Sequence, residues 1–119
     1  MHNLKELKIW NKAIAVSVDV YKATSNFPKE EVYGLTSQIR RCVVSISSNI
    51  SEGAGRNSNK EFLHFLGIAN GSSYELQTQL IISNKLTFLS NDLLESLLKQ
   101  IEEIQKMNYT FQKTIQTKI

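Results

Sequence analysis

The sequence is poor in the residues that shape disulfide-bonded, strand-rich and membrane-spanning proteins. Its 119 residues include one cysteine, one proline and five glycines. A lone cysteine forms neither an internal disulfide nor a multi-cysteine zinc site, and this scarcity is typical of a reducing cytoplasm. So few turn-forming residues exclude an all-β protein of this length. No apolar run of roughly 18 residues, the minimum for a membrane-spanning helix, is present.

Length and composition favour one compact domain that covers residues 1–119. Hydrophobic residues make up 41% and charged residues 21% of the chain, which is close to the average of globular proteins. The N-terminal segment, Met-His-Asn-Leu-Lys-Glu, is too polar and too acidic for a secretory signal. We therefore expect a cytoplasmic protein that does not associate with a membrane.

Positive charge is concentrated in the first half of the sequence. Residues 1–60 contain nine lysines and arginines against five acids, whereas residues 61–119 contain five against six. The two halves therefore carry +4 and −1, which sum to the net charge of +3. This bias favours an anionic partner, although an ordinary solvated surface explains a charge of this size equally well.

Apolar residues recur every three or four positions along the chain, and this spacing predicts four amphipathic helices. We expect them at about residues 5–24, 30–52, 59–88 and 92–116. Pro28 separates the first two helices, and Gly53 and Gly55 are expected to end the second with a left-handed cap. Four such helices with short connections predict an all-α fold, an up-and-down antiparallel four-helix bundle in a single domain.

The same periodicity predicts which side chains face the core. On the first helix the expected inner face is a stripe of large apolar residues, Leu7, Trp10, Ile14, Val18 and Tyr21. On the second helix the expected apolar stripe is Leu35, Ile39, Cys42 with Val43, Ile46 and Ile50. On the fourth helix it is a coiled-coil-like seam with one polar member, Asn108. The members of this seam are Leu94, Leu97, Ile101, Ile104, Asn108, Phe111 and Ile115.

Two local features belong to the third helix. Ser58 and Glu61 form a capping-box pattern at its expected start. Gly67 and Gly71 lie in its interior, where each costs roughly 1 kcal/mol relative to alanine. We therefore expect these glycines to permit a close helix contact or a bend.

Residues that could support catalysis or hold a metal are scarce. Glu61 and His64 have the spacing of a di-iron ligand pair, but such a site needs a second copy on another helix, and the only other histidine is His2. Cys42 lies on the apolar stripe of the second helix, where a packed thiol is expected. No phosphate-binding glycine loop is present. We therefore expect no metal, no cofactor, no catalytic residue and no enzymatic activity.

A polar stripe runs along the second helix beside its apolar one. Its members recur at steps of three and four: Gln38, Arg41, Ser45, Asn49 and Glu52. Amides, serines and arginines suit directed hydrogen bonds, to a neighbouring helix or to phosphates, better than they suit a hydrated surface. A hydrated face remains the alternative. The possible counterparts on the third helix are Asn70, Ser73, Glu75 and Gln77.

Three longer motifs carry a resemblance to a known family. The first consists of two runs, Leu7-Lys-Ile-Trp-Asn-Lys-Ala13 and then Phe27-Pro-Lys-Glu-Glu-Val-Tyr-Gly-Leu-Thr-Ser-Gln-Ile-Arg-Arg41. The second is Ser45-Ile-x-x-Asn49-Ile-x-Glu52-Gly-x-Gly-Arg56, and the third is Phe62-Leu-x-Phe-Leu-x-Ile-Ala-x-Gly71-Ser-x-x-Glu75-Leu76. From Leu7 to Leu89 the chain resembles the bacterial four-helix-bundle family of proteins encoded in intervening sequences of 23S ribosomal RNA genes.

The resemblance implies an up-and-down bundle that assembles as a homopentamer. The family is related to the accessory variability protein of diversity-generating retroelements, which looks like a basic pentameric barrel that engages nucleic acid and a reverse transcriptase. The resemblance therefore implies two kinds of partner, further copies of the chain and RNA or DNA. A reverse transcriptase is implied as a partner only through the relation to the accessory variability protein. It establishes no activity, because fold transfers between relatives better than function does.

Two functions follow from these observations. The first is a non-catalytic accessory protein that binds the backbone of RNA or DNA through Arg40 and Arg56, while Arg41 on the polar stripe is expected to be a structural anchor. Weaker candidate contacts are Lys5, Lys8 and Lys12. The alternative is a homo-oligomeric interaction module that does not bind nucleic acid. The modest charge of +3 and the lack of an aromatic-basic cluster favour this alternative.

Overall fold

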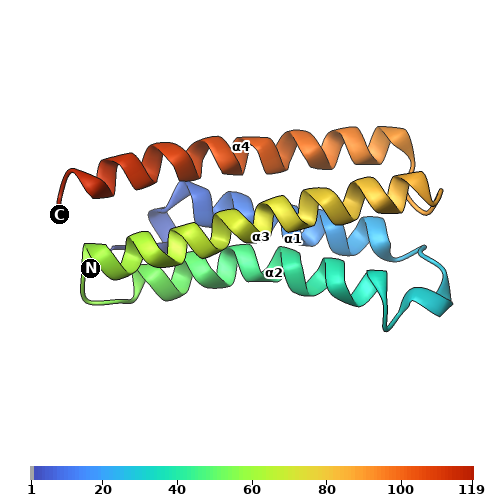
Figure 1. The fold of residues 1–119 in the computed structure, drawn as a ribbon, viewed down its shortest axis with the longest axis horizontal. Helices are drawn as coiled ribbons and strands as arrows, with labels where there is room; N and C mark the ends of the chain where they lie inside the picture. Colours follow the sequence, from blue (N-terminus) through green and yellow to red (C-terminus); the bar gives the residue numbers. More distant parts are fainter. Residues whose placement is uncertain (1) are drawn as a thin grey trace.

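Four long helices and two short 3-10 turns build the protein in a computed structural model, which describes residues 2–119. The elements are η1 (Leu4–Glu6), α1 (Lys8–Thr24), η2 (Lys29–Glu31), α2 (Leu35–Ala54), α3 (Asn59–Lys85) and α4 (Asn91–Gln116). Each long helix runs antiparallel to the next, along a molecule whose longest extent is 46 Å (Figure 1). The all-α, up-and-down four-helix bundle predicted from the sequence is confirmed.

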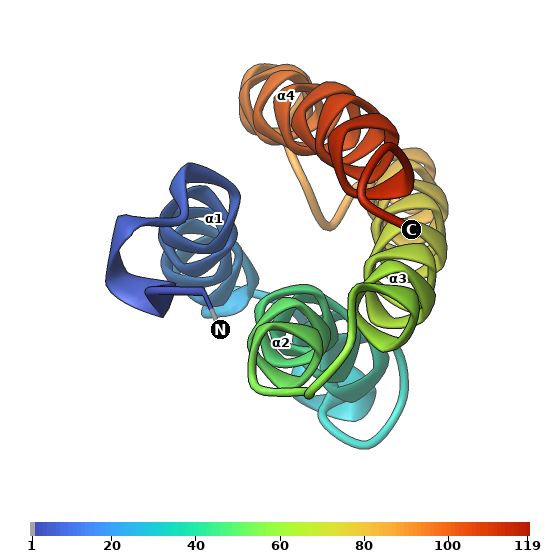
Figure 2. The ribbon, with the colours of Figure 1, turned by 90° about the vertical axis from the view of Figure 1, so that its left-hand side faces the viewer.

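The helices follow one another around the bundle axis. Seen from its end, the bundle has α1 and α3 on opposite sides, with α2 and α4 between them (Figure 2). Each helix therefore packs against two neighbours, and the contact between α2 and α3 is the most extensive. The groove that separates α2 from α3 is the surface on which the polar stripe of α2 lies.

Most of the predicted core faces are confirmed. On α2, Ile39, Val43, Ile46 and Ile50 are completely buried. The seam of α4 is buried at Leu97, Ile101, Ile104, Asn108 and Ile115. Asn108 is satisfied inside the core because its Nδ2 donates to the backbone oxygen of Leu66 at 3.0 Å and its Oδ1 accepts from Gln112.

The predicted inner face of α1 is wrong at Ile14, Val18 and Tyr21, whereas Leu7 and Trp10 pack against the core as partly buried residues. The residues of α1 that enter the core are Ile9, Ala13, Val16, Val20 and Thr24. Ile14, Val18 and Tyr21 instead lie on the outside, and Trp10 is only half-buried. The helix carries two apolar stripes, and the other helices cover the one that contains Ala13 and Val16 rather than the one that contains Val18 and Tyr21.

The second helix begins at Leu35 rather than near residue 30. Residues 29–31 form the separate turn η2, and the carboxylate of Glu31 accepts from the backbone nitrogen of Leu35 at 3.1 Å. Glu31 thereby supplies an acceptor to the first turn of α2, whose backbone N–H groups have no partner within the helix. The left-handed glycine cap predicted for the end of α2 is not formed. Gly55 has right-handed helical angles, and no glycine among the described residues has a positive φ.

The third helix starts as predicted and ends early. Ser58 Oγ accepts from the backbone nitrogen of Glu61 at 3.1 Å, which confirms the N-terminal cap. The helix stops at Lys85 because Thr87 adopts the left-handed conformation, with a φ of 67°. Gly67 and Gly71 are exposed, and no atom lies within 4 Å of a Cβ built on either, so they permit no close contact within the chain.

Candidate functional site

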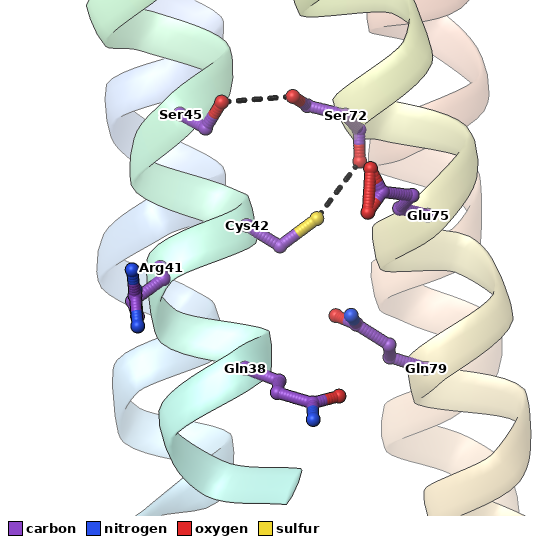
Figure 3. Close-up of a pocket in the computed structure, with 7 residues that line it drawn as sticks. All are labelled: Gln38, Arg41, Cys42, Ser45, Ser72, Glu75 and Gln79. Carbon is purple, nitrogen blue, oxygen red and sulfur yellow. Dashed lines mark hydrogen bonds between the residues drawn. The ribbon is translucent and has the colours of Figure 1, made fainter.

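The polar stripe of α2 faces a groove that it shares with α3. The groove has a volume of about 420 Å³, and Figure 3 shows its two walls. Its lining consists of Gln38, Arg41, Cys42 and Ser45 from α2 and of Ser72, Glu75 and Gln79 from α3. We call this surface the α2–α3 groove.

Hydrogen bonds close one end of the α2–α3 groove. Ser45 Oγ lies 2.8 Å from Ser72 Oγ across the two helices, and Asn49 Nδ2 donates to the backbone oxygen of Ser45 at 2.8 Å. The thiol of Cys42 donates to the backbone oxygen of Ser72 at 3.1 Å (Figure 3). Ser45 and Cys42 therefore connect α2 to Ser72 of α3, whereas Asn49 bonds only to Ser45 within α2.

The other end of the groove is open and unpaired. Gln38, Arg41 and Glu75 are exposed, and within residues 2–119 none of these side chains has a hydrogen-bond or ion-pair partner. Gln79 Oε1 is buried without a partner. Arg41 is therefore not the structural anchor expected from the sequence, whereas the last member of the stripe, Glu52, forms an ion pair with Arg56.

The environment of the groove keeps Cys42 protonated. Burial and, secondarily, the negative charge of Glu75 raise the pKa of the Cys42 thiol from 9.0 to about 11. Both effects act against the thiolate, which is the reactive form of cysteine. A protonated thiol is consistent with its role as a donor to the Ser72 carbonyl, and it agrees with the packed thiol expected at this position.

Sequence reasoning identified only one of the three residues that α3 contributes to the groove. Glu75 was expected there, but Ser73 and Gln77 instead face α4, where Gln105 Nε2 donates to both at 3.2 and 3.1 Å. The missed residues are Ser72 and Gln79, which share a face with Glu75 at steps of three and four. Because Ser72 and Ser73 are adjacent, the sequence does not show which of the two lies on the same face as Glu75.

The two arginines expected to contact nucleic acid are bound to their own chain. Arg40 donates from Nε to Thr24 Oγ1 at 3.0 Å and from Nη2 to the backbone oxygen of Tyr21 at 3.2 Å. Its guanidinium also lies 4.6 Å from the centre of the Tyr21 ring. Arg40 thus fastens α2 to the end of α1.

Arg56 is exposed, but it is paired with neighbouring side chains. It forms ion pairs with Glu52 at 3.4 Å and with Glu61 at 3.7 Å, and its guanidinium lies 4.9 Å from the centre of the Phe65 ring. Its charge is therefore offset by two acids at the turn between α2 and α3.

The lysine candidates lie at the start of the chain and do not join the arginines. Lys12 forms an ion pair with Glu103 of α4, and the hydrogen bond and positive charge of Lys12 lower the pKa of that carboxyl group. Lys5 and Lys8 are exposed, and within the described part of the chain neither forms an ion pair. Of the five candidate cations, Arg40 is therefore bound to α1, Arg56 to α3 and to Glu52 of α2, and Lys12 to α4.

An exposed apolar surface lies along α1 and the adjoining side of α2. The exposed fractions of its side chains are 39% for Ile14, 49% for Val18, 43% for Tyr21 and 40% for Val44. The three α1 residues share one side of that helix, and Val44 lies one turn from Arg40, which stacks on Tyr21. We call these four residues the α1–α2 apolar face.

Metal sites and membrane spans were also sought in residues 2–119. No group of three or more histidine, cysteine, aspartate or glutamate side chains in this range is placed to hold a metal ion. No helix in it combines the length and apolar character needed to cross a bilayer.

Comparisons with known proteins agree with the fold and with the motifs. One solved structure, described as a protein with unknown function from the S23 ribosomal protein family of Bacteroides thetaiotaomicron VPI-5482, has a TM-score of 0.79 at 24% sequence identity. The similarity covers 88% of this chain and 98% of that one. No match was found among curated proteins. Residues 5–110 match the family described as 23S rRNA-intervening sequence protein, and the chain therefore belongs to this family.

Proposed function

We propose that this protein is a non-catalytic module that assembles with copies of itself through the α1–α2 apolar face. The observation that carries the proposal is the outward stripe of Ile14, Val18 and Tyr21, which continues to Val44. Monomeric proteins seldom expose neighbouring large apolar side chains in this way, because their contact with water is unfavourable. A second copy of the chain that covers the α1–α2 apolar face removes these side chains from water.

The chemistry of the face suits a like-charged partner. The only arginine beside it, Arg40, is bound inward to Thr24 and Tyr21. Covering this face therefore does not leave the guanidinium of Arg40 without a partner. The resemblance to homopentameric relatives favours five copies. In a closed ring of identical subunits, every copy makes the same contacts, so the apolar face of each copy is covered.

Light scattering after size exclusion tests this assembly. We expect the wild-type protein to be a multimer at micromolar concentration and Val18→Asp to be a monomer, because the substitution places a charge in the contact. Thr78→Asp is the matched control, since it introduces the same charge on an exposed side of α3 and should leave the mass unchanged. A wild-type monomer, or a multimer that tolerates Val18→Asp, would contradict the proposal.

Nucleic-acid binding is a second proposed function, which the unpaired cations favour. Arg41, Lys5 and Lys8 are exposed and without ion-pair partners in the described residues, so they are better placed than Arg40 and Arg56 to contact phosphates. Five copies would carry a net charge of +15 (5 × 3). The summed field of an assembly attracts a polyanion more strongly than one subunit does.

Salt dependence distinguishes this function from simple self-assembly. Affinity for structured RNA and duplex DNA should fall between about 50 and 200 mM salt, because counterions released from the phosphates drive such binding. Arg41→Gln and Lys8→Gln should weaken it, whereas Arg56→Gln should not. Binding that is undetectable at low salt would leave the protein as an interaction module alone.

A further inference from the structure

A second groove brings together two exposed tyrosines that are far apart in the sequence. It lies between the neighbouring helices α3 and α4 (Figure 2), and it is lined by Tyr74 of α3 and Tyr109 of α4. The groove consists of two adjoining hollows of about 300 and 580 Å³, which share Tyr74, Glu102 and Gln105. We call this surface the α3–α4 groove. Its aromatic side chains are open to a ligand, because the exposed fractions of Tyr74 and Tyr109 are 54% and 65%.

Two glutamines that line the α3–α4 groove are held in place by hydrogen bonds. Gln105 Nε2 donates to Gln77 Oε1 at 3.1 Å and to the buried Ser73 Oγ at 3.2 Å. These bonds leave one donor, Gln77 Nε2, and one acceptor, Gln105 Oε1, without a partner within residues 2–119. Neither atom is enclosed, since the buried side-chain atoms that lack a partner in this range belong to Thr36 and Gln79. The groove therefore presents an accessible donor and an accessible acceptor in fixed positions.

Positive charge lies on both sides of Tyr109 along α4. Lys106 lines the groove one turn before Tyr109, is exposed, and forms no ion pair in the described part of the chain. Lys113 follows one turn after Tyr109, and its Nζ lies 5.1 Å from the centre of the tyrosine ring. Glu102, the acid that lines the groove, is one turn farther from Tyr109 than Lys106 is. An anionic group of a ligand is therefore attracted to the Tyr109 end of the groove.

Exposed aromatic rings, a fixed donor beside a fixed acceptor and a nearby cation are the groups that recognise a nucleotide. Bases stack on aromatic side chains, amides pair with base edges, and lysines contact phosphates. We propose that the α3–α4 groove binds unpaired nucleotides of single-stranded RNA or DNA. Bases stack on Tyr74 and Tyr109, and a phosphate contacts Lys106. The edge of one base pairs with Gln77 Nε2 and Gln105 Oε1.

This site goes beyond the proposed phosphate contacts because it selects single strands. Arg41, Lys5 and Lys8 are proposed to contact phosphates, which duplexes and single strands share. Stacking on a tyrosine requires a base that is not already stacked and paired inside a duplex. The α3–α4 groove contains none of those three cations, so the two sites do not depend on each other.

Fluorescence anisotropy with a labelled single strand of about 12 nucleotides, and with the duplex of the same sequence, tests the site. Tyr109→Ala should weaken single-strand binding about tenfold, because it removes one stacking platform. Tyr109→Phe should retain the affinity, since it keeps the ring, and neither variant should change duplex binding. Tyr33→Ala is the matched control, because Tyr33 is 95% exposed and lies outside the groove.

Three results would overturn the assignment. One is single-strand affinity that both Tyr109→Ala and Tyr74→Ala leave unchanged. Another is the absence of single-strand binding, including the case in which the groove binds a proline-rich peptide instead, since aromatic grooves also recognise such peptides. The third is an equal affinity for AMP and for the strand, which would assign the groove to a free nucleotide.

The same two probes separate this site from the phosphate contacts proposed above. If those contacts exist, Arg41→Gln and Lys8→Gln weaken the duplex and the single strand together. A loss that Tyr109→Ala causes for the single strand alone supports the α3–α4 groove whether or not the duplex binds. Duplex binding that depends on Arg41, with no effect of Tyr74→Ala or Tyr109→Ala on either probe, overturns the groove and leaves the proposed function intact.

Discussion

Gly53 and Phe62 approach so closely that a Cβ atom on Gly53 would lie 2.8 Å from Phe62 Cδ1. The same atom would lie 2.8 Å from Cβ of Phe65. Gly53 is in the last turn of α2, and the two aromatic residues are in the first turns of α3. The missing side chain therefore lets the end of α2 pack directly on the start of α3, next to the turn that joins them.

Gly53→Ala should destabilise the protein by about 1–3 kcal/mol, because the new methyl group must displace two packed aromatic residues. Gly67→Ala is the matched control. Nothing lies within 4 Å of a Cβ at Gly67, so alanine there should stabilise α3 by about 1 kcal/mol. Urea unfolding measures both changes, and equal effects of the two substitutions would contradict this account of Gly53.

Thr87→Gly should stabilise the protein by about 1 kcal/mol, because Thr87 holds a positive φ that glycine adopts without steric cost. The Phe88 nitrogen donates to the Ser83 oxygen and the Thr87 nitrogen donates to the Asn84 oxygen, the pattern of a helix end that favours glycine here. Thr78→Gly, inside α3, should be slightly destabilising instead. Thermal unfolding of the two variants shows whether the signs differ as expected.

Asn108→Ala should lower the free energy of unfolding by about 1–3 kcal/mol, because it removes the donor to the Leu66 oxygen and leaves a gap in the core. Gln112→Ala removes the other partner of Asn108 at a less buried position and should cost less. Chemical denaturation provides the comparison. A larger loss from Gln112→Ala would show that the bond between Gln112 and Asn108, rather than the buried bond from Asn108 to Leu66, stabilises this end of the bundle.

Cys42 should react slowly with iodoacetamide in the folded protein. With its pKa raised from 9.0 to about 11, the thiolate fraction at about pH 8 is about 100-fold lower than in the unfolded chain. Glu75→Gln should speed the reaction modestly, since burial is the larger cause. Alkylation followed by mass spectrometry in native buffer and in denaturant measures both effects, and equal rates would contradict the raised pKa.

The same pKa shift predicts a loss of stability in alkali. The unfolded thiol ionises near pH 9.0 and the folded thiol near pH 11, so the contribution of Cys42 is complete below pH 9 and disappears as the pH rises towards 11. Cys42→Ser lacks a group that ionises in this range. Its stability should therefore fall less than that of the wild-type protein over the same pH interval, which denaturant titrations at several pH values can measure.

The sequence was most informative where each helix carried one apolar stripe. On α2 and α4 the buried residues are those that the spacing predicted, from Ile39 to Ile50 and from Leu97 to Ile115. On α1 the spacing fitted two stripes, and the one with larger residues was chosen although Ala13 and Val16 face the core. Periodicity establishes that a stripe exists, but it does not establish which stripe the other helices cover.

The candidate site was predicted in part for a similar reason. The stripe from Gln38 to Glu52 was visible because its members recur on one helix. Whether each member is paired depends on residues from other helices, such as Ser72, which bonds to Ser45. The same is true of Arg40 beside the stripe, which donates to the backbone oxygen of Tyr21. Arg40 and Arg41 are adjacent in sequence, yet one is bound to α1 and the other is free in the groove.

The sequence by itself determined that this protein is a four-helix bundle, because helical periodicity, caps and turns are properties of short segments. It also placed Asn108 as the one polar member of the apolar seam on the fourth helix, but the burial of this residue is known only from the structure. Only the tertiary structure decided which face of α1 is exposed, which arginines are free and that Gln79 Oε1 is buried without a partner. These features arise where two helices meet, and burial and pairing there depend on distances between side chains that are remote in sequence.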